Sequence, residues 1–468
     1  MRPPLHLLVA ALALTALGST ISAASAQVSA RELDAPSGAS PAPLHYRLEN
    51  GLEVILQPIE GRAFTAVAVT YHVGSADQPA GYRGLAHLTE HLMFSGTDEL
   101  GDGEPHAYLD SLGAVTHNAT THADDTVYYE SVPSSQLERT LWLEAHRMAR
   151  LLSGLSAARV ERQRRVVLHE GVQNGHYGWR GRAREITDAL VYGPTHPYAM
   201  IQERAEDVSA IELPHVQWFF QTYYAPDNAT LALVGGFDPD EARGLVERMF
   251  GPIRRSARAP SRARERPRPI EGEALVRMEV QSTRDFVSVI WQTPPWGADG
   301  DAALDILSSV LVQGDDAPLR VALVDSGLAL GVDALQSSRE LASEFRITAV
   351  AAPEHSPAEL AAAIDAALAG VRGFSEVAID DARAAWARRD ENAQEGIVWR
   401  ASILGIRGAD GYLGTIENER ARYASVNSPS IIEAMRRYLP RDRRVVFLGH
   451  ANPMADAPGR VLETRWIR

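Results

Sequence analysis

Alternation of apolar and polar side chains predicts several β-strands. Residues 46–56 alternate on both sides of Asn50-Gly51, a pair typical of tight turns, so this stretch is expected to form a β-hairpin. Residues 64–73 are rich in β-branched side chains and residues 231–234 form a short apolar run, so both are expected strands. In the second half of the chain, residues 276–280 and 286–291 have the same strand-like character.

Segments in which apolar residues recur every three or four positions lie between these predicted strands. This spacing predicts helices over residues 85–93, 157–173 and 301–312. Another helix is expected to begin after Ser356, with Pro357 in its first position and Glu359 completing a capping box, and to run to about residue 368. Strands and helices are therefore mixed in both halves, which predicts an α+β domain built twice.

The domain limits follow from composition. Residues 254–268 contain seven Arg with Pro260 and Pro267 and almost no apolar side chain, which indicates a linker over residues 254–272. This linker is either a tether lying on acidic surface or a basic strip that recruits acidic peptides. We therefore expect one domain over residues 43–253 and a second over residues 273–468.

The N-terminus has the pattern of a signal peptide over residues 1–26. Arg2 is its charged residue, residues 7–17 are mostly apolar, and Ala24-Ser25-Ala26 is a small-residue cleavage site. The apolar run is too short to span a bilayer comfortably. We expect cleavage after Ala26, a flexible tail over residues 27–42, and a periplasmic protein without stable membrane insertion.

Composition excludes several kinds of chemistry. The 468-residue chain has a formal charge of −14, which argues against a nucleic-acid partner because such proteins present a basic face. It contains no Cys, so cysteine nucleophiles, thiolate metal sites and disulfides are excluded. All 46 of its basic residues are Arg, which removes lysine Schiff-base chemistry and the phosphate-binding P-loop.

The candidate chemistry lies in His87-Leu88-Thr89-Glu90-His91, on the first predicted helix. Positions i, i+3 and i+4 share one helix face, so the two imidazoles can hold one zinc ion with the Glu90 carboxylate beside it. Zinc lowers the pKa of a bound water to about 7, and a nearby Glu can then accept its proton. Two histidines with purely structural contacts are the alternative.

A catalytic zinc needs a third protein ligand, and Glu170 is the candidate. It follows Val166 and Val167 on the second predicted helix and is expected to share their apolar face. An inward carboxylate is costly unless it meets a cation. A structural ion pair with an arginine remains an alternative role for Glu170. His169 is the neighbouring candidate ligand, but it is rotated about 100° around the helix.

With these motifs the chain resembles the pitrilysin-like zinc metallopeptidases, the M16-type inverzincins, and especially their half-length bacterial members. The most specific match is the block over residues 84–97, and the likeness extends over most of the N-terminal half. It includes Asn118-Ala119, residues 163–170, His196-Pro197-Tyr198 and residues 224–231. The family's fold implies two tandem αβ domains, each an antiparallel sheet flanked by helices, forming half of a clamshell chamber.

The resemblance also implies roles for individual residues. His87, His91 and Glu170 would bind Zn²⁺, and Glu90 would be the general base of an endopeptidase. Asn118 and Ala119 would lie on a strand edge that pairs with the backbone of an extended peptide. Gln163 stands where the family often has an acidic residue supporting the metal site, and it cannot add negative charge. Independently of the resemblance, His117 and His122 lie close to Asn118 in the sequence, and they are either rim residues of the site or simply exposed histidines.

The chain departs from the family at the Arg–Tyr pair that orients the scissile peptide. The corresponding positions here are Leu323 and Leu330, with Arg320 nearby as a possible substitute. The resemblance therefore implies a heterodimer in which a homologous half-length subunit supplies the Arg–Tyr pair. A non-catalytic structural subunit, or a zinc hydrolase acting on non-peptide substrates, are the alternatives.

Overall fold

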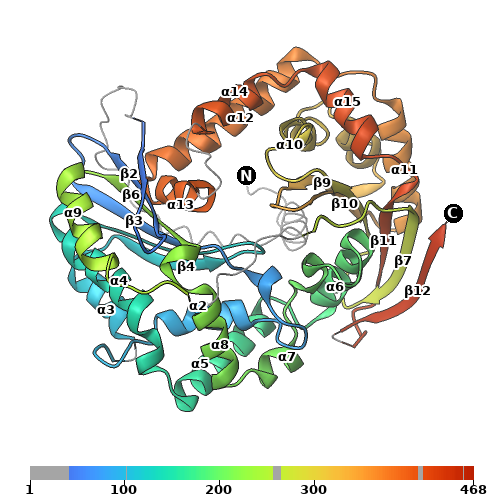
Figure 1. Cartoon of the computed structure of the whole chain (residues 1–468). Helices are drawn as coiled ribbons and strands as arrows, with labels where there is room; N and C mark the ends of the chain where they lie inside the picture. The colour runs from blue at the N-terminus through green and yellow to red at the C-terminus, as the bar shows by residue number, and fades with distance from the viewer. Residues whose placement is uncertain (1–41, 102, 257–264, 409–414, 457, 468) are drawn as a thin grey trace, which may run out of the picture.

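A computed structural model describes residues 42–101, 103–256, 265–408, 415–456 and 458–467. The predicted signal peptide, the predicted tail up to residue 41 and residues 257–264 of the predicted linker lie outside these ranges. The described chain forms two halves, each built on a six-stranded sheet. Figure 1 shows these halves side by side, with the first sheet in blue to green and the second in yellow to red.

The first sheet has the strand order β1-β2-β6-β3-β5-β4. Its strands are β1 (Leu44–Arg47), β2 (Glu53–Pro58), β3 (Phe64–Tyr71), β4 (Thr116–Thr121), β5 (Thr126–Pro133) and β6 (Ala229–Gly235). β1 and β2 form the predicted hairpin, with Leu44 opposite Leu56. β2 and β6 are parallel, and the other neighbours are antiparallel. The short strand β4 lies at the edge.

The second sheet has the strand order β12-β7-β11-β8-β10-β9. Its strands are β7 (Gly272–Val280), β8 (Phe286–Thr293), β9 (Ala329–Ser337), β10 (Ser343–Ala351), β11 (Arg443–Ala451) and β12 (Arg460–Ile467). The series β7-β11-β8-β10-β9 repeats the connectivity of β2-β6-β3-β5-β4, including the parallel pair of β7 with β11. The predicted α+β fold, made twice, is therefore confirmed, although the halves show no obvious sequence identity.

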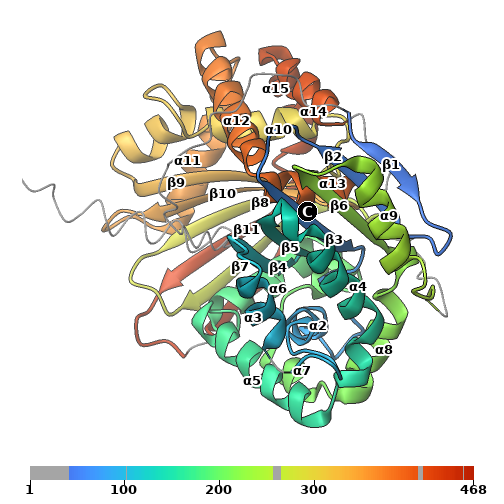
Figure 2. The ribbon, with the colours of Figure 1, turned by 90° about the vertical axis from the view of Figure 1, so that its left-hand side faces the viewer.

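The helices of the first half lie on one side of the first sheet (Figure 2), with one exception described below, and one of them carries the candidate motif. They are α2 (Leu85–Met93), α3 (Glu104–Ser111), α4 (Leu137–Gly154), α5 (Ala157–Gln173), α6 (Trp179–Tyr192), α7 (Ala205–Ala210), α8 (Leu213–Tyr223) and α9 (Pro239–Phe250). The bounds of α2 and α5 are the predicted ones. In Figure 2, α5, α7 and α8 lie around α2 below the sheet.

The helices of the second half are α10 (Asp301–Val310), α11 (Pro357–Gly370), α12 (Glu376–Glu395), α13 (Ile397–Gly408), α14 (Thr415–Ala424) and α15 (Ser428–Tyr438), with a π-helical segment over Arg320–Asp325. The Ser356 side chain accepts a hydrogen bond from Glu359 N, and Glu359 bonds back to Ser356 N at 2.7 Å. The predicted capping box is thus confirmed, and the helix ends two residues beyond the predicted limit.

Each half also packs one helix on the other half's sheet. α13 lies on the first sheet, where Ala401 and Leu404 join a buried cluster with Ile55 and Val234. Conversely, α6 lies against the second sheet, where its Trp179 is buried with strand residues of that sheet. Figure 1 shows α13 beside β3 and α6 beside β11. The two halves are therefore interlocked through two apolar interfaces.

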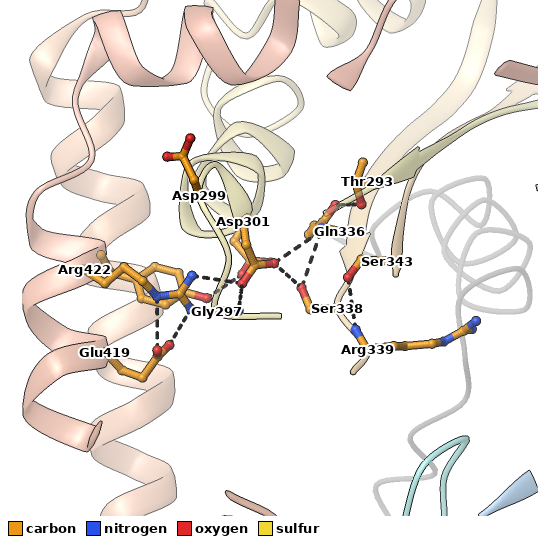
Figure 3. A network of polar contacts seen from close by, with 12 residues as sticks. Thr293, Gly297, Asp299, Asp301, Gln336, Ser338, Arg339, Ser343, Glu419 and Arg422 are labelled. Atoms are coloured by element: carbon orange, nitrogen blue, oxygen red, sulfur yellow. Dashed lines mark hydrogen bonds and ion pairs between the residues drawn. The ribbon is translucent and has the colours of Figure 1, made fainter. Parts of the chain in front are cut away.

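A buried carboxylate organises the start of α10. Asp301 is fully buried and accepts hydrogen bonds from Gly297 N at 3.0 Å and from the Ser338 hydroxyl at 2.6 Å. It also forms an ion pair at 2.9 Å with Arg422 of α14 (Figure 3). Figure 3 shows the neighbouring Arg339 side chain extending away from this network. Asp301 thus ties α10 to α14 and to the end of β9.

Within the described ranges, no helix combines the length and apolar character needed to cross a bilayer.

Candidate metal centre

Helix α2 presents the two motif histidines on its less buried face. Leu85, Leu88 and Leu92 are fully buried in the core of the first half, whereas the His87 and His91 side chains keep 24% and 19% of their exposure. The helix begins after Gly84, whose φ of 100° is in the left-handed region. A side chain there would be strained and would also meet Val208 at 2.5 Å.

The N-terminus of α2 is held from outside the helix. The Gln78 side chain accepts hydrogen bonds from Gly84 N at 2.7 Å and from Ala86 N at 3.1 Å. Because the first N–H groups of a helix lack partners within it, this side chain acts as a distant cap. The loop before α2 thereby fixes the start of the helix, and with it the direction of His87.

Helix α5 brings Glu170 to the two histidines. His87 Nε2 and His91 Nε2 are 3.1 Å apart, and Glu170 Oε2 lies 3.7 Å from the first and 3.4 Å from the second. Zinc–ligand bonds of about 2.0–2.1 Å at tetrahedral angles put ligand atoms about 3.3 Å apart. The spacing of the three side chains therefore fits one zinc ion. Among the described residues, they form the group of three or more His, Cys, Asp or Glu side chains that could hold a metal ion.

Fewer valines than predicted share the buried face of α5 with Glu170. Val160 and Val167 are buried, but Val166 is 39% exposed, so the prediction that Val166 shares the buried face is wrong. The reason is geometric, because the buried stripe of α5 is narrow and Val166 lies just outside it. His169 is exposed and does not belong to the three-residue group.

Glu90 lies on the same helix but is not part of that group. It is buried, with 8% of its surface exposed, and its Oε2 accepts a 2.5 Å hydrogen bond from the Thr121 hydroxyl. Thr121 is the last residue of β4, so the edge strand holds this carboxylate beside the histidines. The contact with Thr121 is one that the sequence did not indicate.

A second residue missed by sequence reasoning is Glu203, which contacts a motif histidine. Its Oε1 lies 2.7 Å from His87 Nδ1, and its other oxygen is 3.6 Å from His176. Burial opposes ionisation of Glu203, but the two histidines outweigh it and lower its pKa to about 2. A permanently charged carboxylate on Nδ1 leaves Nε2 of His87 free to bind a metal.

The Gln163 side chain makes no hydrogen bond with the three ligands or with any other described residue. A negative charge next to the three ligands is supplied instead by Glu203, in the loop before α7. Glu203 and His87 are 116 residues apart in sequence, so no local spacing could have found this pair.

The predicted substrate edge is an edge in the structure. β4 pairs with β5 on one side, with Asn118 opposite Tyr129 and Ala119 opposite Tyr128, and it is the last strand in its sheet. The Asn118 side chain is exposed, and its Oδ1 accepts a hydrogen bond from Ala119 N at 2.9 Å. Ala119 itself is buried.

The two neighbouring histidines are paired with acidic residues. His117 lies 2.9 Å from Asp110, and His122 lies 2.8 Å from Asp125. His117 lies within β4, and His122 directly follows its last residue.

Comparison with known proteins identifies the family. The profile described as Insulinase (Peptidase family M16) matches residues 53–175, and the profile described as Peptidase M16 inactive domain matches residues 210–385. The chain belongs to the M16 peptidase family. The chain is 28% identical over 286 residues to zinc protease PqqE of Helicobacter pylori. This match covers 59% of the chain and 63% of that protein. The match thus spans less than two thirds of this curated relative.

Two solved structures share the fold. A protease from Helicobacter pylori matches with a TM-score of 0.77 at 21% identity, covering 88% of this chain and 100% of that one. The periplasmic protease PqqL from Escherichia coli matches with a TM-score of 0.68 at 19% identity, covering 88% of this chain and 48% of that one. These likenesses agree with a half-length M16 chain of two αβ units.

The second half of this M16 chain lacks the metal motif. α2 and α10 both follow the second strand of their repeat and both begin after a glycine with positive φ. Counted from these glycines, the positions of His87, Glu90 and His91 carry Ala303, Ile306 and Leu307 in α10, which are all buried and apolar. The candidate centre is thus confined to the first half.

The positions expected for the Arg–Tyr pair hold apolar side chains in different environments. Leu323 is fully buried in the π-helical segment, whereas Leu330 on β9 is 41% exposed. Arg320 lies 3.3 Å from Asp315 and 3.6 Å from Asp325, so two aspartates already pair with its guanidinium.

Proposed function

We propose that this protein is a zinc-dependent endopeptidase with His87, His91 and Glu170 as zinc ligands. The observation that carries the proposal is the triangle of ligand atoms with edges of 3.1, 3.4 and 3.7 Å, which matches tetrahedral zinc coordination. Homologues named zinc proteases support it. A zinc ion held there would polarise a peptide carbonyl and make a nearby water easier to deprotonate.

Glu90 is proposed as the general base. It lies on the histidine helix, one turn from His87, and the Thr121 hydroxyl fixes one of its oxygens. A carboxylate held in this way can accept a proton from the attacking water and deliver it to the leaving amine. Glu203 keeps His87 oriented and the site negatively charged, which favours a divalent cation.

The substrate is proposed to bind in an extended form along β4. The outer edge of β4 faces no further strand of its sheet, so its backbone groups can pair with a peptide. Asn118 is exposed beside this edge and can donate its amide N–H to the peptide backbone. Cleavage should therefore favour flexible peptides or unfolded segments that can adopt an extended conformation.

The chain is proposed to work with a homologous half-length subunit. Neither Leu323 nor Leu330 can donate a hydrogen bond to a peptide carbonyl, and Arg320 is held by two aspartates. This chain also matches 48% of the PqqL protease, so a second half of similar fold is the natural complement. We further propose export to the periplasm, which rests on the residue pattern over 1–26.

A peptidase assay with matched variants tests this function. Glu90→Gln should keep about one zinc per chain and lose cleavage of a quenched fluorescent peptide, because it removes a base but no ligand. Glu170→Ala should lower zinc content, measured by atomic absorption after dialysis. Glu161→Gln, on the exposed side of α5, is the control and should change neither readout. Normal zinc retention by Glu170→Ala would rule out this third ligand, and zinc binding without peptide cleavage would favour a non-catalytic subunit.

A further inference from the structure

A cavity of about 360 Å³ lies between α6 and the second sheet. Trp179 of α6 and Phe286 of β8, whose ring centroids are 5.4 Å apart, form part of its apolar wall. The cavity extends to Thr121, His122 and Ala123 at the end of β4. It therefore joins the two halves of the molecule directly beside the candidate metal centre. Its size is within the range of small-ligand sites.

The charged residues that line this cavity are all basic. Its wall contains four arginines, Arg180, Arg184, Arg339 and Arg346, and no Asp or Glu among its described residues. The sign of this charge is opposite to the net formal charge of the chain, which is −14. Arginine presents five N–H donors in a planar fork that matches a carboxylate.

Two of these arginines bind the same carboxylate, which lies outside the cavity wall. Glu344 Oε1 is 2.9 Å from Arg184 and 3.3 Å from Arg346, and Arg184 also bonds Asp188 at 2.9 Å. Glu344 and Asp188 do not belong to the wall. These ion pairs fix the positions of Arg184 and Arg346 and neutralise part of their charge.

The other two arginines have no such partner. Among the described residues, no carboxylate lies within 4.0 Å of Arg180 or Arg339. The Arg339 guanidinium lies over the rings of Tyr192 and Tyr198, at 5.5 and 5.3 Å from their centroids, and bonds the Tyr192 hydroxyl at 3.2 Å. The tyrosines hold Arg339 in place, while Glu344 and Asp188 compensate part of its charge from beyond ion-pair distance.

The buried charge is also incompletely satisfied at Arg346. Its Nε is buried and has no hydrogen-bond partner within the described chain. Burial lowers the pKa of Arg346, and the neighbouring Arg184 adds to this effect. An anion in the cavity would offset both costs, because a buried donor without a partner costs about 1–3 kcal/mol.

Two residues of the cavity wall contact residues of the candidate metal centre. Thr121, on its wall, donates the 2.5 Å hydrogen bond to Glu90, and His176, also on its wall, lies 3.6 Å from Glu203. A peptide that pairs with the edge of β4 and passes Glu90 leaves the strand at Thr121. The next part of that peptide then meets the cavity.

We propose that this cavity is a specificity subsite that binds a carboxylate of the peptide substrate, with Arg339 and Arg180 as the binding cations. The inference rests on the proposed peptidase function. The carboxylate has two possible sources, an acidic side chain or the C-terminus of a short peptide. Both present the same planar anion, and the test separates them.

The test uses the zinc-loaded full chain, with its partner subunit if one is needed. Four quenched fluorescent peptides derived from one parent sequence form two pairs. Two peptides carry Glu or Gln on one side of the cleavage point, and two end in a free acid or an amide. We expect the charged member of one pair to have a kcat/KM about 10–100-fold higher, as charge-assisted hydrogen bonds of about 1.5–3 kcal/mol imply. The pair that shows the difference identifies the source.

Arg339→Gln and Arg180→Gln should each reduce this preference toward unity, whereas Arg248→Gln, an exposed arginine of α9, should leave it intact. Equal cleavage of all four peptides, or a preference that survives both variants, overturns the subsite and leaves the peptidase function standing. A second readout is calorimetric binding of uncleaved peptides to Glu90→Gln. A third outcome separates the two proposals. No peptide is cleaved, but the acidic peptide of a pair still binds more tightly than the neutral one, and Arg339→Gln removes this difference. The peptidase function then fails, whereas the carboxylate site is supported.

Discussion

At the scale of single residues, the candidate centre depends on carboxylates that act on histidines. Glu170 supplies a negative ligand atom, whereas Glu203 contacts the far nitrogen of His87. The second contact fixes which nitrogen carries the proton, and it keeps the ring from rotating. Burial alone would lower the pKa of His87, but Glu203, with Glu90 and Glu170, raises it to about 9 in the metal-free chain. The three carboxylates therefore favour positive charge at this ring, and a proton competes with a metal ion for Nε2 at neutral pH.

The contribution of Glu203 can be measured. Glu203→Gln keeps the size of the side chain but removes its charge, so zinc affinity should fall about 10–100-fold, as is typical for carboxylates that support a ligating histidine. A competition titration with a chromophoric chelator at neutral pH would measure the change in Kd. Glu206→Gln, an exposed residue three positions later, is the matched control. An unchanged Kd for Glu203→Gln would show that the contact with His87 is only structural.

The residues of the centre were partly accessible from sequence. The spacing of His87, Glu90 and His91 defines one helix face, so their grouping follows from the periodicity of a helix. Glu170 needed a second helix with a recognisable buried stripe, and the resemblance to a known family. Glu203, Thr121 and Gln78 lie in loops or at a strand end, where no periodic pattern says which way a side chain points.

At the scale of elements, α6 and α13 form apolar interfaces between the halves, because each packs on the sheet of the other half. α13 approaches the first sheet closely because it presents Ala401, Ser402 and Gly405 to it, all buried. The apolar pattern of α13 and α6 predicts one buried face for each helix. It does not reveal which sheet covers that face, since both sheets present buried apolar residues. The interlocking of the halves was therefore not predictable from the sequence.

The close approach of α13 makes Gly405 sensitive to substitution. A Cβ at this position would lie 2.3 Å from the hydroxyl of Thr70, which is fully buried on β3. Gly405→Ala should therefore lower the free energy of unfolding, because an overpacking cost of about 1–3 kcal/mol exceeds the helix-propensity gain of about 1 kcal/mol.

Gly244→Ala in α9 is the matched control for that experiment. A Cβ there meets nothing within 4 Å, so only the propensity gain remains and stability should rise. Chemical denaturation of both variants would show a difference of on the order of 2 kcal/mol. Equal effects of the two substitutions would mean that α13 can move away from the sheet at little cost.

The contact between α10 and α14 should make stability depend on pH. Burial, together with the charge of Asp301, raises the pKa of Asp305 to about 7, against the effects of Tyr423 and Arg422. The folded-state pKa lies above the unfolded value of about 3.9, so the favourable contribution is complete below about pH 4. It is lost as pH rises through about 7, where the buried carboxyl must ionise.

Asp305→Asn should remove this loss. The amide oxygen can still accept the hydrogen bond from Tyr423, which is a residue of α14. Relative to the parent, the variant should gain on the order of 2 kcal/mol between pH 5 and pH 8. Parallel stability curves for the two proteins over this range would contradict the assignment.

At the scale of the whole molecule, the duplicated fold has become asymmetric. Both repeats keep the strand order and the glycine before the second-strand helix, but the motif positions in α10 have become Ala303, Ile306 and Leu307. These three apolar side chains are buried in the core of the second half, so the second half repeats the fold of the first without the motif residues. Its functional contribution is the wall of the arginine-lined cavity, which the first half could not build alone.

The asymmetry extends to the groups that should orient a scissile peptide. Leu323 is buried, Leu330 offers an apolar surface on β9, and Arg320 is paired with Asp315 and Asp325. The described chain therefore holds a candidate metal centre and a substrate edge, but it lacks a donor pair at the positions where the family has one. A homologous subunit that carries an Arg and a Tyr seven positions apart would complete the site across the interface.

The purified chain alone should consequently be a weak peptidase. Orienting and electrostatic groups are commonly worth about 10²–10³ in rate each, so adding a homologous half-length subunit with the Arg–Tyr pair should raise kcat/KM by at least about 100-fold. Size-exclusion chromatography with light scattering should show a one-to-one complex under the same conditions. A partner whose Arg and Tyr are replaced by Leu should still form the complex but give no acceleration, which separates assembly from chemistry. If the lone chain cleaves peptides at full rate, and the partner neither binds nor accelerates it, then the orienting groups lie within this chain. The guanidinium of Arg320, freed from its aspartates by Asp315→Asn and Asp325→Asn, would then be the first to examine.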